Sequence, residues 1–360
     1  MIQLKPDLEK VMARFDAWWE CAIIDRPLVS ISIPKPDKEH LPGPSAKIYT
    51  SQRERWFDID YRVAVTETSL RNTLFLGDAL PVAWPNLGPE VFAAFYGCEL
   101  IFGEDTSWST PILDDLSHEA LDTLRLETNS LYFKTIETLT DALLTAGKDT
   151  FIVGYTDLHA GGDALAAFRD PQNLCIDLLE YPEHVKKLCG RITNDFLSVY
   201  DIFHTKLSAA GMPSTTWCPA TCTGKFHVPS NDFSCMLSTE MFTELFLPGI
   251  ILECRHMDRN IYHLDGPQAL RHLDVLLDVP EIDAIQWVPG TGREYWADWI
   301  DVYQKIQRKG KALQILSVPV NDLSILTEVL KPGGVWISNI SGLTNREESR
   351  AALDVLSRWR

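Results

Sequence analysis

The stretch NIYHLDGPQALRHLDVLLDVPEIDAIQWVP, residues 260–289, contains two short β-rich runs with a helical pattern between them. NIYHLDG ends at the turn-forming Gly266, and GPQALRHLDVLL places apolar residues three and four positions apart. DAIQWVP is again a short β-rich run. A strand, a helix and a second strand in this order indicate two parallel strands joined by a helical crossover.

The same alternation extends over most of the chain. Long amphipathic segments, such as residues 170–207 and 293–310, separate short β-rich runs. Strands joined by helices predict an α/β fold of the (β/α)8 TIM-barrel class, and the chain has a suitable length. An open doubly wound sheet is the alternative, although no G-x-G-x-x-G turn of the Rossmann type follows the first strand. The β-rich runs are residues 72–84, 150–158, 214–220, 224–230, 260–266, 283–289, 311–318 and 333–340.

Residues 1–70 precede the first of these runs. They begin with a helical pattern and continue through the strand-like PLVSISI (residues 27–33) into a Pro-rich segment (residues 34–47). We expect residues 1–70 to form a helical N-terminal extension packed on the barrel. Residues 71–360 then form the TIM barrel as a single catalytic domain.

The composition is that of an acidic globular protein. Hydrophobic residues make up 45% and charged residues 23%, which supplies enough apolar side chain for a large core. The formal net charge of −17 argues against nucleic acid as a partner, because phosphate contacts need clustered Lys and Arg side chains. Nucleic acid is therefore absent from the predicted partners.

The start of the sequence has no apolar signal-peptide core, and no later segment has the pattern of a membrane span. The 8 cysteines are spread along the chain and do not form a compact disulfide framework. These features predict a cytoplasmic protein without a membrane partner. Cys218 and Cys222 could form half of a zinc knuckle, but no second close pair follows, so we expect them to pack locally.

His263 and Asp265 stand two apart where a β-rich run ends, so their side chains share one face and can reach one point. In a TIM barrel the catalytic groups lie at the C-terminal ends of the strands. Asp265 before Gly-Pro is also a good helix cap, and a capping carboxylate can still orient His263. The predicted catalytic residues are His263, Asp265 and Asp78.

The same rule gives candidates for substrate binding. Asp157 and His159 bracket one residue before a Gly-Gly turn, and aromatic side chains near loop ends suit an apolar or cationic methylated ligand. Asp232 is expected to fix its loop. The predicted substrate-binding residues are Trp84, Asp157, His159, Trp217, Gln286 and Trp287, and further strand-end residues are Cys218, His227, Ser317, Asn339 and Ser341.

Several segments resemble, in order, the uroporphyrinogen decarboxylase superfamily. VGYTDLHAGGDALAAFRDPQNLCIDLLEYPEHVKKL (residues 153–188) is similar to its strand, turn and helix with a Pro-Glu start. SNDFSCMLSTEMFTELFLPGI (residues 230–250) is similar to its Asp-containing loop and following helix, and RNIYHLDG, GKALQILSVP and GGVWISNI come next. The resemblance extends from about Arg26 to the C-terminus and implies a TIM barrel.

One branch of this superfamily removes carboxylates from porphyrinogens without a cofactor and opens with the arginine-rich motif Met-Arg-Gln-Ala-Gly-Arg-Tyr. The comparable segment here, DRPLVSISIPKPDKEH (residues 25–40), has Arg26 as its only arginine. Asp78 is the counterpart of the Asp that centres the substrate in that branch. The missing arginines argue against porphyrinogen decarboxylation, because a polycarboxylate needs guanidinium partners.

The other branch comprises cobalamin- or corrinoid-linked methyltransferases, often with zinc. They place His-x-Cys at one strand end and a further Cys after the last strand. Here His263 keeps the histidine, Asp265 stands at the first Cys position, and Asn339 or Ser341 stands near the second. The metal ligands that the resemblance implies are His263, Asp265 and Asn339, a harder set that suits zinc or another divalent metal.

We therefore expect an enzyme closest to the methyltransferase branch, which demethylates a small substrate and passes the methyl group to a corrinoid on a carrier protein. The alternative is a cofactor-free or metal-assisted lyase or decarboxylase in which Asp78 and His263 transfer protons. A binding module on a degenerate barrel is a third alternative, since a fold does not imply an activity. A homodimer is one candidate assembly.

Overall fold

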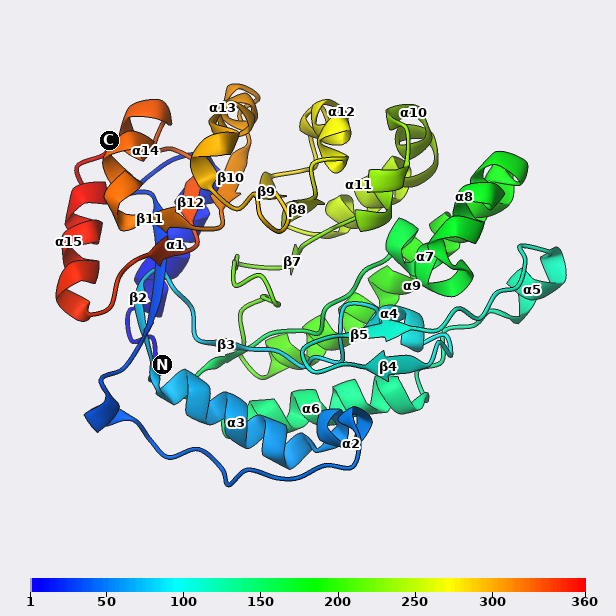
Figure 1. The fold of residues 1–360 in the computed structure, drawn as a ribbon, viewed down its shortest axis with the longest axis horizontal. Helices are drawn as coiled ribbons and strands as arrows, with labels where there is room; N and C mark the ends of the chain where they lie inside the picture. Colours follow the sequence, from blue (N-terminus) through cyan, green and yellow to red (C-terminus); the bar gives the residue numbers. More distant parts are fainter. Residues whose placement is uncertain (1) are drawn as a thin grey trace.

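The computed structural model describes residues 2–360, and a seven-stranded sheet lies at its centre (Figure 1). The strands follow the order β2-β1-β12-β10-β9-β8-β7, and every neighbouring pair is parallel except β1 and β2. Their bounds are β1 Leu28–Pro34, β2 Thr73–Gly77, β7 Phe226–His227, β8 Arg259–Asp265, β9 Ala284–Val288, β10 Ala312–Ile315 and β12 Val335–Ile337.

Short strands continue the architecture beyond this sheet. β3 (Val82–Ala83) pairs in parallel with β6 (Ile152–Val153), and Tyr155 N, just after β6, donates to Thr215 O at 3.0 Å. The arrangement is compatible with a TIM-barrel-like fold, although the ladders over residues 2–360 do not close into one continuous barrel. Two small sheets complete it, one from β4 (Leu100–Phe102) and β5 (Ser107–Ser109) and one from β11 (Val318–Pro319) and β13 (Ile340–Ser341).

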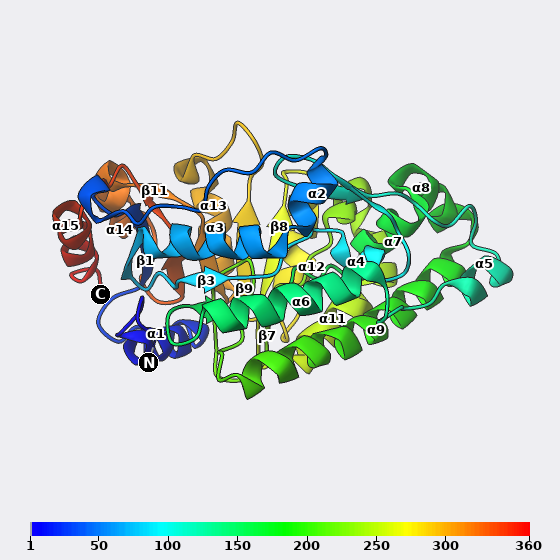
Figure 2. The ribbon, with the colours of Figure 1, turned by 90° about the horizontal axis from the view of Figure 1, so that it is seen from below.

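Helices cover the strands on both sides. Figure 1 shows α12, α13 and α14 along one edge and α3 and α6 along the opposite edge, and Figure 2 shows α6 and α9 running side by side. The helices are α1 Leu8–Trp19, α2 Gln52–Phe57, α3 Ile59–Arg71, α4 Val91–Ala94, α5 His118–Thr123, α6 Leu131–Ala146, α7 Gly161–Arg169, α8 Pro171–Glu180, α9 Pro182–Ala209, α10 Thr239–Met241, α11 Leu247–His256, α12 Leu273–Leu277, α13 Ile300–Arg308, α14 Leu323–Val329 and α15 Arg346–Leu356. No helix within residues 2–360 has the length and apolar character that crossing a bilayer requires.

α1 closes one end of the sheet. Its apolar side chains, among them Phe15 and Trp18, form a buried cluster with the first residues of several strands. The rings of Phe15 and Trp18 lie 5.6 and 5.8 Å from the ring of Trp336 in β12. Five buried residues of this cluster are the first residues of their strands, and they are Leu28, Ile152, Phe226, Ala284 and Ala312. α1 therefore covers the N-terminal ends of the parallel strands and leaves the C-terminal ends free for a site.

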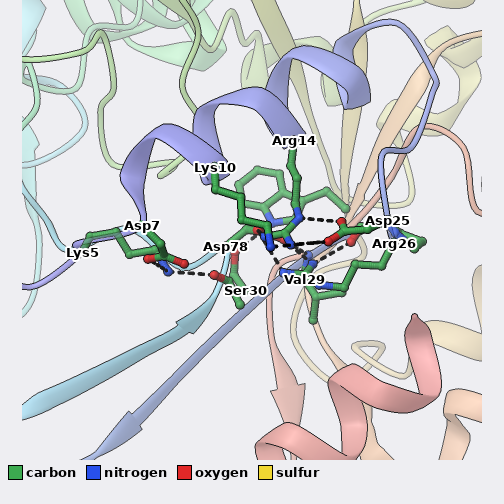
Figure 3. Close-up of polar contacts among 12 residues, drawn as sticks. Lys5, Asp7, Lys10, Arg14, Asp25, Arg26, Val29, Ser30 and Asp78 are labelled. Carbon is green, nitrogen blue, oxygen red and sulfur yellow. Dashed lines mark hydrogen bonds and ion pairs between the residues drawn. The ribbon is translucent and has the colours of Figure 1, made fainter. Parts of the chain in front are cut away.

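A buried charge fixes α1 in this place (Figure 3). The carboxylate of Asp78 accepts hydrogen bonds from Arg14 at 3.0 Å and from Arg26 at 2.5 and 3.1 Å, and it also accepts the backbone N–H of Val29 at 2.9 Å. Arg14 also pairs with Asp25, which lowers the pKa of that carboxyl to about 2. These contacts join α1, the segment before β1 and the turn after β2.

The predicted first barrel strand, residues 72–84, is wrong as a single strand. The chain turns at Gly77, whose φ is +59° and where a Cβ would collide with the carbonyl oxygen of Val29. Residues before the turn form β2, antiparallel to β1, and residues after it form the parallel β3. A continuous apolar run does not reveal such a reversal of direction.

The strand-like PLVSISI becomes β1, which lies inside the central sheet between β2 and β12. Residues 28–34 are thus part of the sheet and not of a covering layer, while α1, α2 and α3 supply the expected helices of this region. The boundary at residue 70 between an extension and a barrel domain stays a prediction. The helix expected in GPQALRHLDVLL is shorter than its pattern and amounts to a 3-10 turn followed by α12.

We predict that Asp78→Asn lowers the free energy of unfolding by about 3 kcal/mol, because it leaves the buried guanidinium of Arg26 without its anion and Arg14 with Asp25 alone. Urea denaturation followed by tryptophan fluorescence measures the change. Asp114→Asn, at an exposed position, is the matched control and should unfold like the wild type. Equal stability of Asp78→Asn and the control would show that the ion pairs contribute nothing to folding.

Candidate active site

One group of side chains gathers where β8 ends. Ile261, His263 and Asp265 alternate along β8, so His263 and Asp265 project from the same face. Asp232, from the turn Asp232–Met236, completes the group, and its Oδ1 lies 3.9 Å from His263 Nε2. One ligand atom each of Asp232, His263 and Asp265 lies within 4.8 Å of the others.

Gln286 on the neighbouring strand fixes the proton of His263. The amide nitrogen of Gln286 donates to Gln314 Oε1 at 2.8 Å, so its Oε1 faces His263 Nδ1 and accepts a hydrogen bond from it. This hydrogen bond occupies Nδ1, so Nε2 is the nitrogen that faces Asp232. Trp217 packs edge-on against the ring of His263, with centroids 5.4 Å apart, and restrains its rotation.

A second histidine group lies between the end of β6 and the start of α7. His159 Nε2 donates to Asp157 Oδ1 at 2.8 Å, and His159 Nδ1 donates to Ser230 Oγ at 2.5 Å. Ser230 Oγ in turn donates to Asp163 Oδ2 at 3.0 Å. Both ring nitrogens of His159 thus donate to acceptors, which is the arrangement of an imidazolium.

The electrostatics agree with this geometry. Burial disfavours the charged ring of His159, but Asp157 and Asp163 outweigh burial and raise its pKa well above the ordinary value. Burial would raise the pKa of Asp163, yet its contacts with His159 and with backbone N–H groups lower it. For Asp232, burial and the nearby charge of Asp163 raise the pKa to about 6.

Ser230 joins the two groups. It forms a parallel β-bridge with His263, and its hydroxyl contacts both His159 and Asp163. The next residues of the same loop bring Asp232 to His263, and Phe233 N donates to Asp163 Oδ1 at 2.9 Å. One loop, residues 230–233, therefore carries Asp232 of the first group and holds Asp163 of the second.

A cavity of about 240 Å³ adjoins this loop. His159, Asp163 and Asp232 line its polar side. Alanine side chains from α4 and α7, together with Phe233 and Met236, form much of the remaining wall. The cavity gives a small molecule access to His159 and Asp163 of the second group and to Asp232 of the first.

The structure brings several predicted residues together. His263, Asp265, Gln286 and Trp217 belong to the first group, and Asp157 and His159 belong to the second. Trp84 directly follows β3 and is half-buried, at the same end of the parallel strands. The pairing of His with Asp at two strand ends is therefore present, while the predicted functions of these residues stay predictions.

Other predicted residues lie elsewhere. Trp287 alternates with Gln286 on β9, is completely buried and packs on Trp299 at 5.0 Å, so it points to the helical layer and cannot touch a ligand in this site. Asp78 is completely buried at the start of β1, among the N-terminal strand ends. Its environment is that of a structural ion pair, and a catalytic role for Asp78 stays a prediction without a supporting contact.

Asn339 follows β12, three strands away from β8 in the sheet order. Its amide nitrogen donates to Ser317 Oγ at 3.0 Å, and the side chain is exposed. No contact within residues 2–360 connects Asn339 with His263 or Asp265. A role for Asn339 as a metal ligand stays a prediction.

Asp163 and Ser230 were not among the predicted site residues, and Asp232 was expected only to fix its loop. Asp163 follows the Gly-Gly pair at the start of α7, where an acidic residue is ordinary helix chemistry. Ser230 and Asp232 flank Asn231 in residues 230–250, the segment that resembles the Asp-containing loop of the superfamily. This resemblance was the only indication in the sequence that the loop could contribute to a site. Their meeting with His159 and His263 depends on folding, because these partners are distant in the sequence.

His227, another strand-end candidate, faces the helices. Its ring lies 4.6 Å from Phe196 of α9, and its Nε2 lies 3.5 Å from Glu253 Oε2 of α11. Burial lowers the pKa of His227 well below its ordinary value and raises that of Glu253 to about 8. This buried pair lies behind the site and does not line the cavity.

Comparison with protein-family models and with curated proteins gives no match. A solved methyltransferase from Methanosarcina mazei matches over 97% of this chain and 98% of that chain, with a TM-score of 0.58 and 10% identity. This likeness shows a shared fold alone and fits the expected methyltransferase-like architecture. Membership of the uroporphyrinogen decarboxylase superfamily stays a prediction.

A second solved structure is that of a protein from Silicibacter pomeroyi DSS-3 described as a glycerophosphoryl diester phosphodiesterase. It matches over 78% of this chain and 95% of that chain at 10% identity, with a TM-score of 0.28. This score is too low to support a conclusion about this chain.

We predict that Glu253→Gln changes the pH dependence of stability. Between the ordinary pKa of 4.5 and the folded value of about 8, the folded protein holds a proton that the unfolded chain releases. The free energy of unfolding contributed by Glu253 therefore falls as the pH rises through this window. Glutamine stays neutral at every pH. The free energy of unfolding of the variant should therefore equal that of the wild type near pH 4.5 and exceed it at pH 8 by on the order of 1 kcal/mol.

Urea denaturation at several pH values measures this difference. His227 is present in both proteins, so its own titration largely cancels. Glu180→Gln, an exposed change at the end of α8, is the control and should leave the curve unaltered. Parallel curves for Glu253→Gln and the wild type would contradict the assignment of a raised pKa.

Proposed function

We propose that the chain is an enzyme that binds a divalent metal ion through Asp232, His263 and Asp265 and transfers a methyl group of a small substrate held in the adjoining cavity. The observation that carries this proposal is the convergence of the three ligand atoms within 4.8 Å. The shared fold with a methyltransferase supports it as an analogy.

The donor set fits a metal ion. Two carboxylates and one neutral imidazole are hard or borderline ligands, suited to zinc or to an ion such as manganese. Gln286 plays the part of the partner that metal-binding histidines commonly have, because it holds the proton on Nδ1 and leaves Nε2 for the ion. A bound ion would supply Lewis-acid polarisation of a substrate atom.

Other residues of the chain would orient the substrate, exclude water and supply a proton. The cavity walls exclude water and orient the substrate toward the loop 230–233. His159 carries both ring protons and lines the cavity, so it is the group able to give a proton to the atom that loses its methyl group. Ser230 and Asp163 hold the ring in position for this transfer.

The methyl acceptor belongs to the same proposal. The resemblance implies a corrinoid carried by a partner protein, and the hard ligand set argues against the thiolate-rich zinc site of the related branch. With a corrinoid as the acceptor there is no acceptor thiol to activate, so the metal ion would polarise the substrate atom that carries the methyl group. The substrate is therefore expected to be a methylated amine, ether or thioether.

We predict that the purified protein binds about one equivalent of Zn²⁺ or Mn²⁺ and that His263→Ala and Asp232→Asn abolish this binding. Gln286→Leu keeps all three ligands but removes the partner of Nδ1, so it should weaken binding about 10- to 100-fold. Metal analysis after dialysis and competition with a chromophoric chelator measure both effects. Unchanged metal content in His263→Ala would sink the proposed site, while Asp114→Asn is the control for a lost surface carboxylate.

Methyl transfer itself is tested separately. Cob(I)alamin is incubated with the metal-loaded protein and a panel of methylated amines, ethers and thioethers, and formation of methylcobalamin is followed by absorbance. The reaction should depend on metal and should fall about 100-fold in His159→Gln, since an imidazolium proton is lost. Absence of methylcobalamin with every donor would contradict a corrinoid acceptor.

His159 also favours a second candidate function. A fully protonated imidazole between two carboxylates is a general acid that needs no cofactor, as a lyase or decarboxylase requires. This alternative predicts a metal-independent reaction that His159→Gln abolishes and His263→Ala leaves intact. Release of carbon dioxide from small carboxylic acids would distinguish it from methyl transfer.

A further inference from the structure

The cavity beside the loop 230–233 is shaped for a small ligand with an apolar body. α4 and α7 line it with alanines, and Phe233 and Met236 close it from the turn after the loop. Its volume of about 240 Å³ corresponds to about eight water molecules at roughly 30 Å³ each. The alanines that form the wall are Ala93, Ala164, Ala166 and Ala167.

The charged groups of the cavity wall are mostly acidic. Glu90, Asp163 and Asp232 line it, and no lysine or arginine does so among the described residues. His159 is the only basic side chain of the wall, and both of its ring protons are already donated to Asp157 and Ser230. A ligand in the cavity therefore meets carboxylates, apolar surface and one imidazolium, whose protons are held by Asp157 and Ser230.

This combination selects against an anion. A bound carboxylate or phosphate would have to lose its hydration shell next to three carboxylates without a guanidinium or ammonium partner. A cation meets the opposite situation, because the carboxylates replace its hydration and the ring of Phe233 offers a negative face. The acidic net charge of the chain, −17, adds a long-range attraction of the same sign.

We propose that this cavity binds a small organic cation, an ammonium or sulfonium group with methyl substituents, between Glu90 and Asp163 and against Phe233. This proposal names the substrate class of the site. It rests on the proposed function in one respect, namely that the substrate binds in this cavity. When a quaternary ammonium gives its methyl group as a cation to the corrinoid acceptor, the electron pair of the acceptor forms the new bond, and the electron pair of the broken N–C bond stays on nitrogen, where it can take a proton from His159.

Three probes of nearly equal size test the charge. Choline carries a trimethylammonium group, 3,3-dimethylbutan-1-ol replaces the nitrogen by carbon, and 3,3-dimethylbutanoate carries a negative charge. Isothermal titration of the full chain, freed of metal with a chelator, should give choline an affinity at least about tenfold above the neutral probe. The anionic probe should not bind measurably. Equal affinities, tighter binding of the neutral or anionic probe, or no binding of choline would overturn the inference.

A variant pair locates the binding. Glu90→Gln removes one charge and keeps an oxygen that can accept the hydrogen bond from Ser109 N. It should lower the affinity for choline about three- to tenfold and leave the affinity for the neutral probe unchanged. Glu180→Gln, which removes the same charge at an exposed position, should change neither. Equal effects of the two variants on choline would show that the cation binds outside the cavity.

The same measurements separate this inference from the proposed function. Selective choline binding together with a failure of methyl transfer to cob(I)alamin would support the cation site and contradict the proposed reaction. Methyl transfer from neutral ethers, without discrimination among the three probes, would support the reaction and contradict the cation site.

Discussion

The carboxylate of Asp78 is removed completely from water, and the fold is organised around the balance of its charge. An isolated buried carboxylate is expensive, so Arg14 and Arg26 have to reach it, and Arg14 brings α1 with it. α1 then covers the N-terminal strand ends with Phe15, Trp18 and their neighbours. Because that end is sealed by an ion pair and an aromatic cluster, polar side chains can gather at the other end.

The two histidines of the candidate site have different hydrogen-bond partners. His159 donates from both nitrogens, toward Asp157 and toward Ser230, and is held as an imidazolium. His263 donates from Nδ1 to the amide oxygen of Gln286, and its Nε2 faces Asp232. One site therefore contains two histidines with different hydrogen-bond partners, connected by a single loop.

The local pattern of the chain predicted much of the fold. β9, β10 and β12 lie inside the predicted runs and β8 begins one residue before its run, because alternation and length identify a strand from its own residues. The run 72–84 failed because apolar character does not indicate the direction of a strand after a glycine turn. Gln286 and Trp287 were both predicted to bind the substrate. Neighbouring residues on a strand face opposite sides, however, and only Gln286 points toward the candidate site.

The sequence by itself determined that His263 and Asp265 share a face at the end of a strand, since a two-residue repeat is a property of the strand alone. It also determined the acidic character of the chain. The tertiary structure decided which charges meet. Ser230 reaches His159 over 71 residues of chain, and Asp78 meets Arg14 over 64, because charge balance and hydrogen bonding depend on neighbours in space that no local pattern records.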